Sequence, residues 1–66
     1  MKLSFTEDGA FWDVTVTDSD GNIIMSNRSV LTDDMRTIEY FMAWEQQIKS
    51  FPGLNITEVS HGITLL

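Results

Sequence analysis

The sequence predicts an α+β fold: a small, mainly antiparallel sheet of order β-β-β-α-β with one helix packed on one face. Three observations support this prediction. Two segments with alternating apolar residues surround acidic-glycine turns, an apolar stripe at helical spacing follows them, and a β-branched segment comes after Pro52-Gly53. A chain of 66 residues, 42% of them hydrophobic, has room for one core and one domain, residues 1–66.

The first eighteen residues predict a β-hairpin. Leu3 and Phe5 alternate with polar residues, which is the period of a half-buried strand. A turn over 7–9 ends in a glycine, which is free to adopt positive φ. The clearest strand covers 11–18, where the apolar residues from Trp12 onward share one face and the polar residues share the other.

Three more elements are expected after the hairpin. An Asp-Gly turn over 19–22 leads into a third strand, 23–28. A helix follows with Thr32 as its N-cap, and the proline of Pro52-Gly53 ends it. Its expected apolar stripe is Met35, Ile38, Phe41, Met42 and Ile48, flanked by Tyr40 and Trp44, with Glu45 reaching the rim of the stripe.

The last strand is expected over 54–59. Its residues are rich in β-branched side chains, as a pleated surface prefers. The apolar residues 63–66 either extend this strand or form a short return, and the pattern does not separate the two.

Composition excludes several classes of function. The chain has no Cys, which removes disulfides, thiolate nucleophiles and Cys-ligated zinc. No apolar run is long enough to span a membrane and no signal-peptide pattern opens the chain, so a cytoplasmic location without membrane contact is expected. Ten acidic residues against four basic ones, a net charge of −6, argue against direct binding of nucleic acid through its phosphates.

The sequence predicts neither an enzyme nor a metal or cofactor site. Residues 18–22 resemble the start of a calcium loop, but the glycine is misplaced and Ser29 stands where the closing Glu belongs. His61 is the only histidine and is expected to be an exposed residue at a strand end or turn, with no Ser-His-Asp spacing around it. Most acids lie in predicted turns, where they are solvated and unsuited to acid–base catalysis.

The acidic residues concentrate in one part of the chain, and the predicted hairpin turns and helix start are expected to share one negative surface. Seven of the ten fall within 7–34: Glu7, Asp8, Asp13, Asp18, Asp20, Asp33 and Asp34. One interpretation is a solvated face that keeps the protein soluble. The other is a surface that attracts a positively charged groove on another protein.

The second interpretation yields a set of candidate partner-binding residues. Phe11 lies on the polar face of its strand, where it either covers the hairpin or forms an exposed apolar anchor. The candidates are Phe11, Asp13, Asp18 and Asp20, with Glu7 and Asp8 as secondary members.

Several short segments resemble the small podovirus inhibitor of bacterial RNA polymerase. Over about residues 11 to 60, Phe11-Trp12 resembles the Phe-Trp of that family's first hairpin strand, and 18–20 resembles its acidic turn. Ala43-Trp44 resembles part of its helix, and 53–59 is similar to its last strand. The resemblance implies a phage protein that inhibits transcription by occluding the polymerase in the cytoplasm of an infected bacterial host.

The chain departs from that family in two places. Glu58 and Ser60 stand where the family carries two arginines that help bind the polymerase, and the family has no match for the strand at 2–6. In general style the chain is also similar to the acidic inhibitor of uracil-DNA glycosylase, a DNA mimic, and to anti-CRISPR proteins. These resemblances imply a nuclease or repair enzyme as an alternative partner with a basic surface.

Two further functions remain open at the level of sequence. A small structural module could self-associate as a homodimer through a sheet edge, using Leu3 and Phe5 on a terminal strand or the apolar residues 63–66. A small enzyme or metal sensor is the third reading, and it requires that calcium or zinc stabilise the fold.

Overall fold

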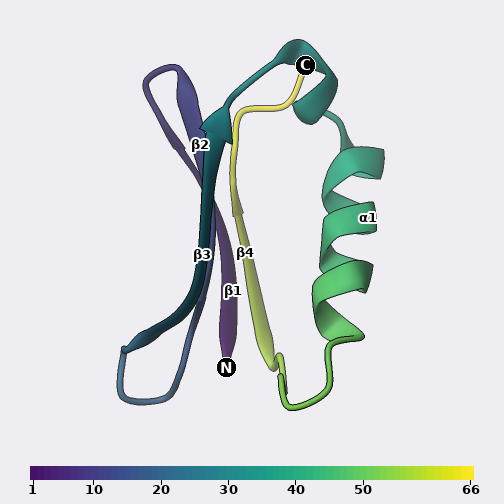
Figure 1. The fold of residues 1–66 in the computed structure, drawn as a ribbon. Helices are drawn as coiled ribbons and strands as arrows, with labels where there is room; N and C mark the ends of the chain where they lie inside the picture. Colours follow the sequence, from purple (N-terminus) through teal and green to yellow (C-terminus); the bar gives the residue numbers. More distant parts are fainter.

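The computed structural model describes residues 1–66 and confirms the α+β class. One four-stranded sheet in the order β3-β2-β1-β4 carries a single α-helix on one face (Figure 1). The elements are β1 (Lys2–Asp8), β2 (Phe11–Thr17), β3 (Ile23–Val30), the 3₁₀ helix η1 (Asp33–Met35), α1 (Ile38–Lys49) and β4 (Glu58–Gly62).

The sheet is antiparallel except at one edge. β1 and β2 form a hairpin in which Asp8 lies opposite Phe11, and β3 continues antiparallel beside β2 with a bulge near Val16. The helix then carries the chain across the sheet, and β4 pairs parallel to β1 with Val59 opposite Leu3. β3 and β4 are therefore the two open edges, on opposite sides of the sheet.

The core lies between α1 and one face of the sheet. The face that carries Lys2, Asp13 and Arg28 has no covering element, and polar residues dominate it. The fully or almost fully buried residues are Leu3, Phe5, Trp12, Val14, Val16, Phe41, Ile48 and Ile63. Period-two alternation along β1 and β2 places five of these on the helix side, as the sequence predicts.

Aromatic contacts determine which side of α1 faces the sheet. Trp12 meets Tyr40 and Trp44 edge-on at centroid distances of 5.7 and 5.4 Å, and Phe41 lies 5.3 Å from Phe5. The helix is rotated so that Tyr40 and Trp44 point inward. Two residues of the expected stripe, Ile38 and Met42, are consequently 53% exposed, so that part of the prediction is wrong.

The helix begins later than expected. Thr32 makes no side-chain cap bond; it precedes the single turn η1, after which the chain bends. Thr37 is the N-cap of α1, and its hydroxyl oxygen accepts a hydrogen bond from the amide of Tyr40. The bend at Arg36 allows its side chain to reach back to the sheet, a long-range contact that a local cap preference does not encode.

The C-terminal part also differs from the prediction. β4 runs from Glu58 to Gly62 rather than over 54–59, although Leu54 and Ile56 still pack against the core. Residues 63–66 form no strand. Ile63 is buried, and the amide of Leu66 donates to the Arg36 carbonyl, so this segment packs beside the start of the helix.

Candidate partner-binding surface

Phe11, Asp8 and Asp13 meet on the uncovered face, as a cluster around Arg28. The register places Arg28 directly opposite Asp13, and its guanidinium lies 3.0 Å from Asp13 Oδ2 and 2.9 Å from Asp8 Oδ2. The same guanidinium lies 4.8 Å from the centroid of the Phe11 ring, a cation–π contact. Hydrogen bonding to Asp8 is the main cause of the raised pKa of Arg28. Two of the predicted carboxylates are thus already neutralised, and Phe11 is partly covered.

Glu7 lies apart from this cluster, because its neighbour across the sheet is the core residue Trp12. Its carboxylate accepts hydrogen bonds from Arg36 Nη1 at 2.9 Å and from the Thr64 amide at 3.2 Å. Arg36 Nη1 also donates to the Thr64 carbonyl. Hydrogen bonding from Arg36, then from Thr64, lowers the pKa of Glu7. Glu7 therefore holds the C-terminal segment against the sheet and takes no part in a shared acidic surface.

Asp18 and Asp20 form the turn between β2 and β3. One carboxylate oxygen of Asp18 accepts from the amides of Asp20 and Asn22, both at 2.9 Å. These bonds, chiefly that from the Asn22 amide, lower the pKa of Asp18. Gly21, with a φ of 86°, supplies the left-handed conformation that closes the turn. Asp18 shapes the turn from within, whereas Asp20 is exposed and forms no ion pair.

The expected single acidic surface does not form. The turn between β1 and β2 lies at the same end of the molecule as η1, but the turn between β2 and β3 lies at the opposite end (Figure 1). The seven-residue strand β2 separates the two ends, a span of roughly 20 Å. The acids are split because the two hairpin turns necessarily lie at opposite ends of the strand they share.

The ion pairs show which carboxylates lack a basic partner. Lys2, Arg28, Arg36 and Lys49, the four basic side chains, all lie within 4.0 Å of a carboxylate. Five carboxylates have no such partner: Asp18 and Asp20 at the β2–β3 turn, here called the turn pole, and Asp33, Asp34 and Glu39 around the start of α1, here called the helix pole.

The helix pole was not among the candidate residues. Asp33 and Asp34 lie in η1, and Glu39 lies in the first turn of α1. All three are exposed. In the sequence these three acids flank a single base, Arg36, which indicates an acidic segment but gives no three-dimensional position.

His61 contributes to packing and to one hydrogen bond. Its ring stacks on Phe5 at 5.2 Å and meets Phe41 edge-on, and its Nε2 lies 3.2 Å from Glu45 Oε1. Lys49 also binds Glu45 and is the main cause of the lowered pKa of that carboxyl group. The histidine is exposed and lies near the end of a strand, β4, as expected, and Glu45 is the only hydrogen-bond partner of its ring.

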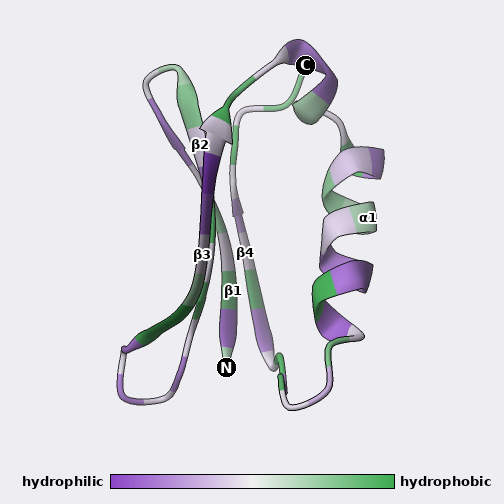
Figure 2. Cartoon of the chain, viewed as in Figure 1, coloured by the Kyte–Doolittle hydropathy of each residue, from purple (hydrophilic) through white to green (hydrophobic).

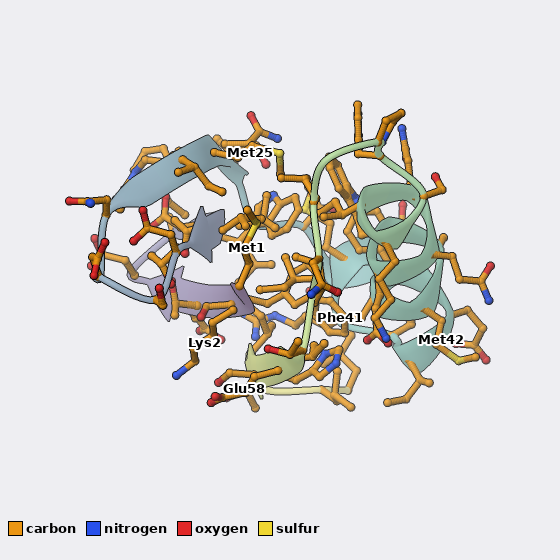
Figure 3. All side chains as sticks on the ribbon, turned by 90° about the horizontal axis from the view of Figure 1, so that it is seen from below. Met1, Lys2, Met25, Phe41, Met42 and Glu58 are labelled. Carbon is orange, nitrogen blue, oxygen red and sulfur yellow. The ribbon has the colours of Figure 1, made fainter.

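The surface contains one open hollow of about 320 Å³, at the end that carries the turn pole. Its lining residues include Met1, Lys2 and Glu58, which Figure 3 labels, and Asp18. Glu58 faces Lys2 at 3.5 Å, and Asp18 is bound by its own turn, so neither carboxylate is free to take a ligand. No group of three or more His, Cys, Asp or Glu residues is placed to hold a metal ion.

Neither helix has both the length and the apolar character needed to cross a membrane.

Among known proteins, no family model matches the chain, and no significant match is found among curated proteins or solved structures. The resemblance to phage inhibitors therefore stays a prediction.

Proposed function

We propose that the protein is a non-enzymatic, phage-type inhibitor that binds a basic surface of a nucleic-acid-processing protein and occludes it. One observation carries the proposal: every basic side chain is already paired, and five carboxylates at the turn pole and the helix pole are not. The field around the protein is therefore negative at both ends. Such a field speeds encounter with a positive groove and selects for it.

The two poles fit an elongated positive groove better than a compact patch. The molecule measures 31 Å along its longest axis, and the poles lie at its two ends (Figure 1). A protein channel that normally tracks a nucleic-acid backbone carries positive charge over a comparable length. Bacterial RNA polymerase is the first proposed target, and a nuclease or repair enzyme is the alternative.

The packing of the remaining polar groups supports a binding role over catalysis. Glu7 and Asp18 hold backbone segments in place, and His61 bonds Glu45 while its ring stacks on Phe5. The one hollow is open and lined by few hydrophobic residues, unlike the enclosed sites lined mainly by hydrophobic side chains that bind small substrates.

The test is capture of a partner from bacterial lysate on the immobilised protein, with elution by increasing salt and identification by mass spectrometry. We expect a nucleic-acid-processing enzyme that elutes as salt screens the attraction. The helix-pole variant Asp33→Asn/Asp34→Asn should weaken capture. Retention of a target that is insensitive to salt, or of no target at all, contradicts the proposal.

A matched control separates position from net charge. Asp13→Asn/Glu45→Gln also removes two negative charges, but from carboxylates that already face a cation and belong to neither pole. At physiological ionic strength, charges farther than about 8 Å from the contact are largely screened. We therefore expect this variant to retain the partner. Equal loss in both variants would show that overall charge, and not the helix pole, drives binding.

A further inference from the structure

β3 is the longer and less charged of the two open edges of the sheet. It has eight residues, Ile23–Val30, and no neighbour on its outer side. β4 has five residues and begins with Glu58, which is exposed and paired with Lys2. A long edge with unpaired backbone groups is a template for another strand, and natural proteins usually guard such edges with charge.

The backbone of β3 presents alternate residues outward. The Leu31 amide donates to the Ala10 carbonyl at 2.8 Å, which places the polar groups of residue 31 on the β2 side. Hydrogen-bonding direction alternates along a strand. The even-numbered residues of the regular part of β3, which are Ser26, Arg28 and Val30, therefore turn their N–H and C=O groups toward solvent.

The only charge on β3 does not guard this edge. Arg28 is held over the Phe11 ring and against Asp8 and Asp13, in the direction of the sheet interior. β3 contains no carboxylate, although the chain has ten. Although the protein has a net charge of −6, two copies of β3 can therefore lie side by side without carboxylates facing each other across the edge.

The apolar residues of β3 are arranged symmetrically. Ile23 and Ile24 at its start are 65% and 45% exposed, and Val30 at its end is 58% exposed. Figure 2 shows this pattern as hydrophobic colour at both ends of β3 with hydrophilic colour between them. A strand that is apolar at both ends matches a reversed copy of itself.

We propose that two copies of this chain pair antiparallel through β3, around a two-fold axis at Asn27, and form one continuous sheet. In this register Val30 of one copy lies beside Ile23 and Ile24 of the other, and Arg28 lies opposite Ser26. No like charges lie directly opposite each other in this pairing, and the two Arg28 side chains, which are diagonal neighbours, are each held by Asp8 and Asp13 of their own copy. The interface is isologous, so it closes at two copies.

The dimer is expected to be concentration-dependent and strengthened by salt. A single strand pairing is small beside the roughly 1,600 Å² of a standard interface. Two copies of net charge −6 repel each other, and added salt screens that repulsion. The proposed binding of a basic partner has the opposite dependence on salt, so failure of one proposal is distinguishable from failure of the other.

Sedimentation equilibrium of the full chain from about 10 µM to about 1 mM tests the dimer. We expect the mass to rise from 7.5 kDa toward twice that value. Ser26→Pro removes an amide that faces away from β2, so no hydrogen bond within the sheet is lost. Proline is tolerated in an edge strand where the N–H faces solvent. It should raise the dissociation constant at least about tenfold. A monomer mass for the unmodified chain at every concentration overturns the proposal.

A matched pair of variants tests the location of the interface even where proline disturbs the strand. Ile23→Lys and Ile38→Lys make the same change at exposed isoleucines, one on β3 and one on α1. Both variants change the net charge from −6 to about −5, so a difference between them reports the position of the substitution and not the net charge. Only Ile23→Lys should raise the dissociation constant, because only Ile23 lies on β3. A larger effect of Ile38→Lys would place the contact on the helix and overturn the pairing through β3.

Amide exchange gives a residue-level readout of the same pairing. In the dimer, the amides of Ser26, Arg28 and Val30 should gain protection as concentration rises, because they become bonded to the second copy. The amides of Asn27 and Ser29 should be protected at all concentrations, because they already face β2. Association without new protection at Ser26 and Arg28 contradicts the proposed register.

Discussion

Replacing Phe41 and Met42 by leucine, one at a time, tests how α1 is oriented on the sheet. The two residues are neighbours in the chain, but Phe41 is 1% exposed and Met42 is 53% exposed. Phe41→Leu removes ring contacts with Phe5 at 5.3 Å and with His61 at 5.6 Å. Lost aromatic pairing and imperfect filling of the site should together cost about 1.5–3 kcal/mol. Met42→Leu should change stability by less than about 0.5 kcal/mol.

Leucine is preferred to alanine at Phe41 because a buried Phe→Ala change costs about 3–5 kcal/mol. A domain of this size has only about 3–10 kcal/mol in total, so the alanine change would remove from about a third to all of it. Urea unfolding followed by tryptophan fluorescence measures both leucine variants, with buried Trp12 as the main reporter. The Phe41→Leu melting temperature should fall by about 6–24 °C. Equal losses for the two variants would refute the orientation of the helix.

Three further outcomes are expected. Gly62→Ala should cost about 1–3 kcal/mol by urea unfolding, because its Cβ would lie 3.0 Å from the Phe5 carbonyl oxygen, with Ser60→Ala as a near-neutral control. Asp18→Ala should speed exchange of the amides that it accepts from, and an unchanged rate would contradict its role in the turn. The pKa values of Glu7 and Glu45 lie below their ordinary value of 4.5, so the stability they provide above that pH should be lost as pH falls through the lowered values. The urea midpoint should be lower at acidic than at neutral pH, and this difference between the two midpoints should be smaller in Glu7→Gln.

The first hairpin, β1 and β2, could be predicted because its local pattern allows one solution. A shift of one residue in β2 would expose Trp12, Val14 and Val16, so burial of one face specifies their direction. The helix is different, because apolar or aromatic side chains occupy most of its circumference. Two orientations are compatible with that pattern, and the contact of Trp12 with Tyr40 and Trp44 selects one of them. A contact between residues so far apart in sequence is not visible in a helical periodicity.

The candidate surface was predicted in part, since long-range ion pairs decide which carboxylates are free. Asp13 and Asp8 bind Arg28 across the sheet, and the bulge in β3 makes that register unpredictable from turn length alone. Glu7 binds Arg36, which is 29 residues away. Leu3 and Phe5 are buried in the central strand β1, so they do not form the docking edge proposed from sequence. The distribution of acids along the chain indicates an acidic protein, and only the fold separates the two poles.

Competition between double-stranded DNA and this protein for the captured enzyme is the measurement that tests the central claim most directly. Because the turn pole and the helix pole are proposed to occupy the groove that holds nucleic acid, binding of the two should be mutually exclusive. We predict that DNA displaces the protein in proportion to its concentration, and that Asp33→Asn/Asp34→Asn is displaced at lower DNA concentration. A stable complex that contains enzyme, DNA and this protein together would contradict occlusion.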